Sequence, residues 1–337
     1  MRKTKVAVAG LGRIGKIHLD NLCRNCDGME VVAVMDPLEE AAQIAAGYGI
    51  SEVCADFDEL IAVEGLEAVA ICSPTDTHAE YVIKAARAGL HIFCEKPLDL
   101  SLERVKEVLQ LVEECKVKLM LGFNRRFDPN FERIRTLVAN GSVGDPQILK
   151  ITSRDPGPPP ISYIKVSGGI FLDMAIHDFD MARYISGKEV KAVYAAATVK
   201  VDPEIGEAGD FDTAVITLTF EDDTLAVIDN SRKAAYGYDQ RLEVFGSKGM
   251  ASADNNFPNN HSLYTSDGIS GDLPLHFFLE RYQESYVKEM KAFAEALQTG
   301  NEMPVGARDG LMSIVIGLAA TLSAREKRPV LISEILS

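Results

Sequence analysis

The sequence predicts an α/β domain with a doubly wound parallel sheet, followed by an α+β domain with a large, mostly antiparallel open sheet. Two observations predict the first domain. Short apolar runs alternate with amphipathic stretches over residues 1–122, and a G-x-G-x-x-G segment directly follows the first run. One observation predicts the second domain: in several runs of residues 123–337, apolar side chains recur at every second position. We therefore expect the domain boundary between residues 122 and 123.

Five short runs in the first domain have the composition of buried parallel strands, because they are continuous and rich in Val, Ile, Leu and Ala. Helices are expected between them. Thr77 and Glu80 have the spacing of a capping box, and Ser101 has the position of an N-cap. The expected strands are Lys5–Ala9, Val31–Met35, Ala68–Cys72, His91–Cys94 and Lys118–Leu121.

The second domain begins with a predicted helix over Phe131–Ala139. Four prolines then predict an extended loop over Ser153–Ser167, before a second helix over Phe171–Ile185. Asp222–Asp223 separates two alternating runs and predicts a hairpin turn. A helix over 282–297 follows, and a last helix over 305–328 could pack back on the first domain. The alternating runs are Ala192–Val199, Thr213–Phe220, Thr224–Asn230 and Arg241–Phe245.

Charge and hydropathy exclude several classes of partner. The formal net charge is −15, from 35 basic and 50 acidic side chains, so the surface repels nucleic acid and anionic lipid. The first residues lack the long apolar core of a signal peptide. No run reaches the roughly 18 apolar residues of a membrane span. We expect a cytoplasmic protein of two domains that binds neither nucleic acid nor membrane.

The glycine segment GLGRIG lies between a predicted strand and a predicted helix, as in a dinucleotide-binding Rossmann domain. Gly10 permits a tight turn, Gly12 lets the backbone approach a diphosphate, and Gly15 lets helix and strand pack closely. Free N–H groups at the helix N-terminus would bind the diphosphate. The predicted cofactor contacts here are Gly10, Leu11, Gly12, Arg13, Ile14 and Gly15.

A carboxylate is expected at the end of the second strand, and Asp36 occupies that position. It would accept hydrogen bonds from the adenosine ribose and repel a 2′-phosphate, which favours NAD over NADP. The nearby basic residues Arg13 and Lys16 could weaken this preference. The alternative is a turn-forming aspartate before Pro37.

Two polar segments directly follow expected strands: SPTDTH at 73–78 comes after Ala68–Cys72, and EKP at 95–97 comes after His91–Cys94. Ligands of open α/β sheets bind at the carboxyl ends of the strands. The backbone of Lys96 is held out of the helical region by the following proline, so its ammonium can point into the crevice. The alternative is an exposed loop lysine. The predicted cofactor contacts here are Ser73, Thr75, His78, Glu95 and Lys96.

A third polar segment, GGIFLDMAIHDFD at 168–180, lies on a predicted helix. Asp173 and His177 are four residues apart and Asp180 is three further on, so the three share one face. A histidine between two carboxylates suits a general base that works near neutral pH. A surface ion pair and a metal site are the alternatives, and no third metal ligand is evident.

These motifs together resemble the glucose–fructose oxidoreductase and inositol dehydrogenase family over nearly the whole chain. Three further segments resemble its inositol-oxidising members: GFNRRFD at 122–128, SRDPGPPP at 153–160 and GGIFLDMAIHDFDMAR at 168–183. The resemblance implies NAD-dependent oxidation of a secondary hydroxyl of inositol, from myo-inositol to 2-keto-inositol, in inositol catabolism. Oxidation of scyllo-inositol, a glucose-type pyranose or another polyol remains the alternative.

The resemblance also implies roles for individual residues. Lys96, Asp173 and His177 would form the catalytic set, with a cis peptide between Lys96 and Pro97 and no metal. The resemblance further implies that the open sheet of the second domain builds subunit contacts, so we expect a homotetramer. The implied substrate contacts are Arg125, Asp155, Asp180 and Tyr236.

A different class of function, a non-catalytic NAD-binding regulator or scaffold, would predict the loss of Lys96 or His177. Both residues are present. A nucleic-acid-binding regulator is disfavoured by the net charge of −15.

Overall fold

The computed structural model describes residues 2–337, and the chain forms two compact units. The first unit comprises Met1–Phe127 and Glu284–Met312, and the second comprises Asp128–Gln283 and Ser313–Ser337. The expected boundary at residue 122 lies close to the end of the first segment. Residues 284–312, from the C-terminal part of the chain, also belong to the first unit and include the beginning of the long terminal helix.

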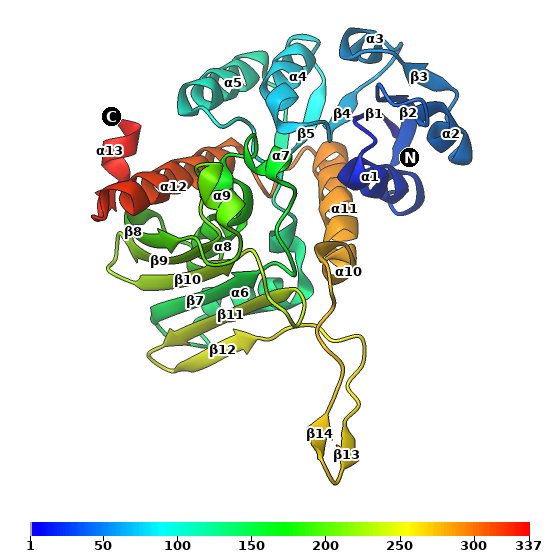
Figure 1. Ribbon diagram of the computed structural model, residues 1–337. Helices are drawn as coiled ribbons and strands as arrows, with labels where there is room; N and C mark the ends of the chain where they lie inside the picture. Colours follow the sequence, from blue (N-terminus) through cyan, green and yellow to red (C-terminus); the bar gives the residue numbers. More distant parts are fainter. Residues whose placement is uncertain (1) are drawn as a thin grey trace. The chain divides into compact units, whose positions relative to one another are not determined.

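A six-stranded parallel sheet in the order β3-β2-β1-β4-β5-β6 forms the centre of the first unit (Figure 1). Its direction of winding reverses between β1 and β4, where open α/β sheets bind ligands at the strand ends. All residues of β4 and β6 are buried, as expected of strands covered on both faces. The strands are β1 (Thr4–Ala9), β2 (Met29–Met35), β3 (Glu52–Cys54), β4 (Ala68–Ile71), β5 (His91–Glu95) and β6 (Leu119–Gly122).

Helices connect these strands. Of the two predicted helix N-termini, one is confirmed and the other is wrong. Ser101 caps its helix, accepting a hydrogen bond from the Arg104 N–H at 3.3 Å. The capping box at Thr77 is wrong, because the helix begins two residues earlier and the Thr77 hydroxyl donates to the Pro74 carbonyl at 2.7 Å. The helices are α1 (Arg13–Arg24), α2 (Ala41–Gly47), α3 (Phe57–Ile61), α4 (Thr75–Arg87), α5 (Leu102–Cys115), the 3₁₀ turn η1 (Asn124–Phe127) and α11 (Gln283–Thr299).

A seven-stranded sheet in the order β12-β11-β7-β10-β9-β8-β15 forms the centre of the second unit (Figure 1). Only β7 and β10 are parallel, so the prediction of a mostly antiparallel sheet is confirmed. The predicted turn at Asp222–Asp223 joins β9 to β10, and Asp223 has a φ of +67°. The strands are β7 (Pro146–Arg154), β8 (Val190–Thr198), β9 (Thr213–Phe220), β10 (Leu225–Ser231), β11 (Asp239–Gly246), β12 (Gly249–Ala253) and β15 (Val330–Leu331).

The second unit also contains a separate hairpin and several helices. The hairpin, β13 (Leu263–Thr265) with β14 (Gly268–Ser270), lies at the tip of a long extension that follows β12 (Figure 1). The helices are α6 (Pro129–Ala139), α7 (Ile161–Ile164), the π-helical turn η2 (Ile170–Met174), α8 (Ile176–Ser186), α9 (Pro203–Glu207), α10 (Phe278–Arg281), α12 (Ala307–Glu326, which begins in the first unit) and α13 (Ile332–Leu336).

The expected loop over Ser153–Ser167 is only partly correct. Ser153 and Arg154 are the last residues of β7, and α7 forms one short helix within the remainder. Strand β7 was not predicted because apolar side chains lie on both of its faces. Ile148 faces solvent, whereas Leu149 and Ile151 are buried. An apolar residue on each face removes the pattern that identifies a half-buried strand.

One face of the second sheet carries exposed apolar side chains in register across four strands. Phe245 pairs with both Ile148 and Met250, and Ile148 pairs with Leu225. Their exposed fractions are 45%, 44%, 57% and 42% for Phe245, Ile148, Met250 and Leu225. Because paired residues in a sheet point to the same side, these four form a continuous strip, which we call the apolar row.

Helix α12 is long and apolar enough to cross a membrane by length and composition alone. However, 56% of its most apolar window is buried within the protein. Core helices of globular proteins have the same properties, so the length of α12 is explained by packing.

Candidate active site

The glycine segment forms a tight turn between β1 and α1. A side chain at Gly10, whose φ is +92°, would lie 2.6 Å from the Ser73 nitrogen, and one at Gly15 would lie 1.8 Å from the Gly10 oxygen. At Gly12 a side chain would meet no atom within 4 Å, so the open side of the loop is at this residue. Helix α1 has no side-chain cap and no acidic residue in its first turn. Its free N–H groups therefore suit the diphosphate of a dinucleotide.

Asp36 lies directly after β2 and contacts the glycine segment. Its carboxylate accepts hydrogen bonds from the backbone N–H groups of Leu11, at 2.5 Å, and Leu38, at 2.9 Å. Each carboxylate oxygen can accept a second hydrogen bond, so the side chain retains acceptor capacity for ribose hydroxyls.

The two polar segments after β4 and β5 are joined by His78. Its Nδ1 lies 2.8 Å from the Pro97 carbonyl oxygen and its Nε2 lies 2.9 Å from the Ser73 carbonyl oxygen. The Ser73 hydroxyl is also 2.6 Å from that of Thr77. His78 is 1% exposed, and both its ring nitrogens face carbonyl oxygens. It therefore fixes the position of the two segments relative to each other.

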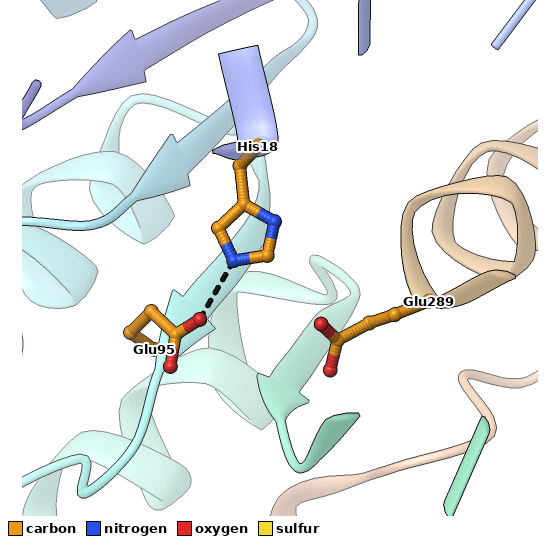
Figure 2. Close-up of side chains that lie close together, drawn as sticks. All are labelled: His18, Glu95 and Glu289. Atoms are coloured by element: carbon orange, nitrogen blue, oxygen red, sulfur yellow. Dashed lines mark hydrogen bonds and ion pairs between the residues drawn. The ribbon is translucent and has the colours of Figure 1, made fainter. Parts of the chain in front are cut away.

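Lys96 follows the last residue of β5, at the carboxyl edge of the parallel sheet. The peptide bond between Lys96 and Pro97 is cis, which confirms the expectation from the family resemblance. The preceding side chain, Glu95, points to His18 on α1, with 2.7 Å between the carboxylate and Nε2 (Figure 2).

In the second unit, Asp173 and His177 lie at a change of helix type. The predicted helix over Phe171–Ile185 exists, but it begins with the π-helical turn η2 that contains Asp173, and His177 is in the first turn of α8. Asp173 and His177 are the two residues of the segment 170–183 that are not buried. They thus form a partly exposed polar pair on an otherwise buried segment, whereas Asp180 is 1% exposed. Single π-helical turns often occur at functional sites.

Two residues that the sequence did not predict, Tyr163 and Arg232, donate hydrogen bonds to the Asp173 carboxylate. It accepts hydrogen bonds from the Tyr163 hydroxyl at 2.9 Å and from Arg232 Nη1 at 3.2 Å. Arg232, which is 1% exposed, also lies 3.5 Å from Asp210. Desolvation of its hydroxyl and the adjacent Asp173 carboxylate raise the pKa of Tyr163, which therefore stays protonated as a donor. These contacts fix the orientation of Asp173.

The four expected substrate contacts are distributed over both units. Arg125 lies in η1 of the first unit and is 5% exposed. Asp155 follows β7, and its backbone pairs with Ser231 and Ala234 at 2.9 and 2.6 Å. Tyr236 lines an open cavity of about 650 Å³ in the second unit.

The Tyr236 hydroxyl takes part in a polar network beside that cavity. It donates to Asp239 at 2.5 Å and accepts from Arg154 at 3.0 Å. Burial and then the hydrogen bond to Asp239 raise the pKa of Tyr236.

Comparison with known protein families agrees with the division of the chain into two units. The family model described as "Oxidoreductase family, NAD-binding Rossmann fold" matches residues 4–123. The model described as "GFO/IDH/MocA C-terminal domain" matches residues 131–252. The first match identifies NAD as the cofactor class of the first unit, whose open glycine loop and uncapped helix fit it.

Individual relatives are similar over the full length. The myo-inositol 2-dehydrogenase of Thermotoga maritima is 49% identical, over 98% of this chain and 99% of that protein. The inositol 2-dehydrogenase of Rhizobium meliloti is 46% identical over 98% and 99%. The crystal structure of Lactobacillus casei scyllo-inositol dehydrogenase with NAD(H) and scyllo-inositol is 30% identical, covers 98% of this chain and 100% of that one, and has a TM-score of 0.92. The resemblance is confirmed, and the chain belongs to the GFO/IDH/MocA family of NAD-binding oxidoreductases.

Proposed function

We propose that this protein is an inositol 2-dehydrogenase that oxidises myo-inositol to 2-keto-inositol with NAD. The observation that carries this proposal is the full-length identity of 49% to a myo-inositol 2-dehydrogenase. The chemistry of the residues supports it, because a lysine, a histidine and an oriented carboxylate are the groups that the oxidation of a hydroxyl needs.

The residues of the chain have separate tasks in this reaction. A bound NAD would supply the acceptor for the hydride that leaves the oxidised carbon. His177 removes the proton of the substrate hydroxyl, and general base catalysis of this kind contributes about 10²–10⁴-fold to the rate. Lys96 stabilises the negative charge that develops on the oxygen. Asp173, held by Tyr163 and Arg232, keeps the catalytic side chains in orientation.

We assign the remaining contacts to the cofactor and the substrate from the position of each residue in its unit. Gly10–Gly15 and the N-terminus of α1 bind the diphosphate, and Asp36 binds the ribose. Ser73, Thr75, Glu95 and Lys96 form the nicotinamide end, where His78 holds the two segments in place. Ring hydroxyls of the substrate bind to polar side chains, for which we propose Arg125, Asp155, Asp180 and Tyr236.

We further propose that the protein is a cytoplasmic homotetramer of inositol catabolism, with residues 1–122 as the NAD domain and 123–337 as the substrate and oligomerisation domain. The apolar row supports the assembly, because exposed apolar strips of this kind are typical of interfaces. The burial of α12 supports a location away from the membrane.

The test is an activity screen. The purified protein is incubated with myo-inositol, scyllo-inositol, glucose and other polyols, each with NAD and with NADP, and the formation of reduced cofactor is followed by absorbance. We expect the highest kcat/KM for myo-inositol with NAD. A clear preference for scyllo-inositol would support the second candidate, which the similarity to the Lactobacillus casei enzyme favours. Activity with none of these substrates would refute the proposal.

A further inference from the structure

A buried cluster of His18, Glu95 and Glu289 lies in the first unit (Figure 2), and Glu95 immediately precedes Lys96 in the sequence. The three residues come from α1, β5 and α11. One side-chain nitrogen or oxygen of each lies within 4.8 Å of those of the other two. His18 and Glu289 are fully buried, and the Glu95 side chain is 14% exposed.

The Glu95 carboxylate is fixed on three sides. It lies 2.7 Å from Nε2 of His18, and its second oxygen lies 3.3 Å from the backbone nitrogen of Lys96. A side chain at Gly122, on the neighbouring strand β6, would lie 2.8 Å from that second oxygen, so a residue without a side chain is required there. His18 is itself held by edge contacts with the rings of Phe93 and Tyr286, at 4.9 and 5.7 Å.

Glu289 is the unusual member of the cluster. Both its carboxylate oxygens are buried, and neither has a hydrogen-bond partner in the part of the chain that the structure describes. The carboxylate points toward His18 and Glu95 (Figure 2). Burial, and then the charge of Glu95, raise the pKa of Glu289 well above its ordinary value. Two ionised carboxylates at this separation in a dry interior would repel each other strongly, so one must carry a proton.

The two neighbouring thiols add no further negative charge to the cluster. Burial raises the pKa of Cys72 and of Cys94 well above the ordinary value of a thiol, so both are neutral. A metal ion fits the geometry less well than a proton does. Ligand atoms about 2.1 Å from a tetrahedral ion lie about 3.4 Å apart. The contact between His18 and Glu95 is shorter, at 2.7 Å, and is a direct hydrogen bond.

We propose that His18, Glu95 and Glu289 form a buried anchor that positions Lys96 for catalysis, with Glu289 as a neutral carboxylic acid and Glu95 as the ionised partner of His18. Glu95 immediately precedes Lys96, so a carboxylate fixed on three sides also fixes the backbone from which the lysine extends. A neutral Glu289 leaves the His18 N–H to Glu95 alone. This inference rests on the proposed role of Lys96 at the reacting hydroxyl, and none of the three anchor residues is proposed to touch the substrate.

A double-mutant cycle tests whether His18 acts through Lys96. The full-length protein is prepared as wild type, His18→Ala, Lys96→Met and the double variant, and kcat, KM and the Kd for NAD are measured for each. We expect His18→Ala to lower kcat roughly ten- to hundred-fold, as a small displacement of a catalytic group does, with much smaller changes in Kd. On the Lys96→Met background the same substitution should cause little further loss.

The outcomes of this cycle distinguish a failure of the anchor proposal from a failure of the proposed function. Equal losses from His18→Ala on both backgrounds would overturn the anchor, because the two residues would then act independently. Full activity of Lys96→Met would instead refute the proposed role of the lysine. If His18→Ala does not fold, His18→Asn, which keeps an N–H donor, is used in the same cycle.

Infrared spectroscopy tests the protonation of Glu289 without reference to catalysis. The wild type should show the carbonyl band of a protonated carboxylic acid that Glu289→Gln lacks, and Glu289→Gln should recover much of the kcat that Glu289→Ala loses. Absence of that band, or a stoichiometric metal ion found by elemental analysis of the purified protein and lost in Glu289→Gln, would overturn the assignment.

Discussion

The Asp36 carboxylate accepts a hydrogen bond from the backbone N–H of Leu11, with 2.5 Å between Oδ2 and the nitrogen. The same side chain therefore contacts the glycine loop and occupies the expected ribose position at the end of β2. The hydrogen bond of Asp36 and its negative charge have separate effects, one on the loop and one on the choice of cofactor. The hydrogen bond to Leu11 supports the loop, whereas the negative charge disfavours a 2′-phosphate on the ribose.

Replacing Asp36 by serine should increase the use of NADP relative to NAD. Removing a like charge near a phosphate is worth a few kcal/mol at most in a partly exposed site, so we expect the kcat/KM ratio to shift roughly ten- to hundred-fold. Steady-state kinetics with both cofactors measure the shift. Asp36→Asn serves as a control because it removes the charge and keeps an acceptor for the Leu11 N–H. An unchanged ratio in both variants would mean that Asp36 does not face the ribose.

Replacing His177 by alanine should remove the general base. We expect kcat to fall by about 10²–10⁴-fold while the Kd for NAD is unchanged, because the dinucleotide binds to the first unit. Turnover and NAD titration measure the two effects. His276→Ala, at an exposed histidine of the same unit, is the matched control and should retain wild-type turnover. Normal turnover of His177→Ala would exclude the histidine as the base.

The sequence predicts where the proposed cofactor-binding residues lie in the fold because its signals are local. Gly10, Gly12 and Gly15 stand in one turn, and Asp36 and Lys96 directly follow buried strands, so recognising the strands places the residues. The parallel sheet was predictable for the same reason, since continuous apolar runs identify its central strands. The short edge strand β3 has only three residues and gave no such signal.

The supporting residues were not predictable because their partners are distant in the chain. His18 and Glu95 are 77 residues apart, and Asp173 and Arg232 are 59 residues apart. Such contacts arise from tertiary packing and leave no periodicity in the sequence. The one local clue to the anchor in the sequence is His18, which lies three residues after Gly15 in the predicted helix.

Arg232 should be important for the stability of the second unit as well as for the orientation of Asp173. Its guanidinium is buried beside the carboxylates of Asp173 and Asp210. Arg232→Met leaves these two charges unbalanced, and we expect the free energy of unfolding to fall by about 3–5 kcal/mol. Urea denaturation measures the loss.

Tyr163→Phe is the comparison for Arg232→Met. It removes one hydrogen bond to Asp173 without leaving an unbalanced charge, so the expected loss of stability is about 1 kcal/mol. Its kcat should nevertheless decrease, because Asp173 loses a hydrogen-bond donor that orients it. Equal stability losses in the two variants would contradict the assigned role of the arginine.

Asp212 should make the protein less stable in acid. It accepts hydrogen bonds from the backbone N–H groups of Lys200, Val201 and Asp202 and from the Thr213 hydroxyl, at 2.8–3.1 Å. Burial acts to raise the pKa of Asp212, but these hydrogen bonds outweigh it and lower the pKa below its ordinary value. A group whose pKa is lower in the folded state stabilises the protein above its unfolded pKa, about 3.9 for aspartate.

This stabilisation is lost as the pH falls from that value through the folded pKa. Urea midpoints measured between about pH 7 and pH 3 should therefore fall more steeply for the wild type than for Asp212→Asn, which cannot titrate. Parallel curves for the two proteins would show that the carboxylate contributes nothing to the acid dependence.

The apolar row should be the surface that holds the proposed tetramer together. Phe245 stands within it, paired with Ile148 on one side and Met250 on the other, so a charge at this position would be enclosed by apolar side chains in any interface that covers the row. Burying an unpaired ammonium is strongly unfavourable. Phe245→Lys should therefore shift the molar mass in light scattering from four chains of 36.7 kDa toward a smaller species. Leu38→Lys, at an exposed leucine of the first unit, should leave the mass unchanged. A tetramer that persists in Phe245→Lys would show that the subunits associate through another surface.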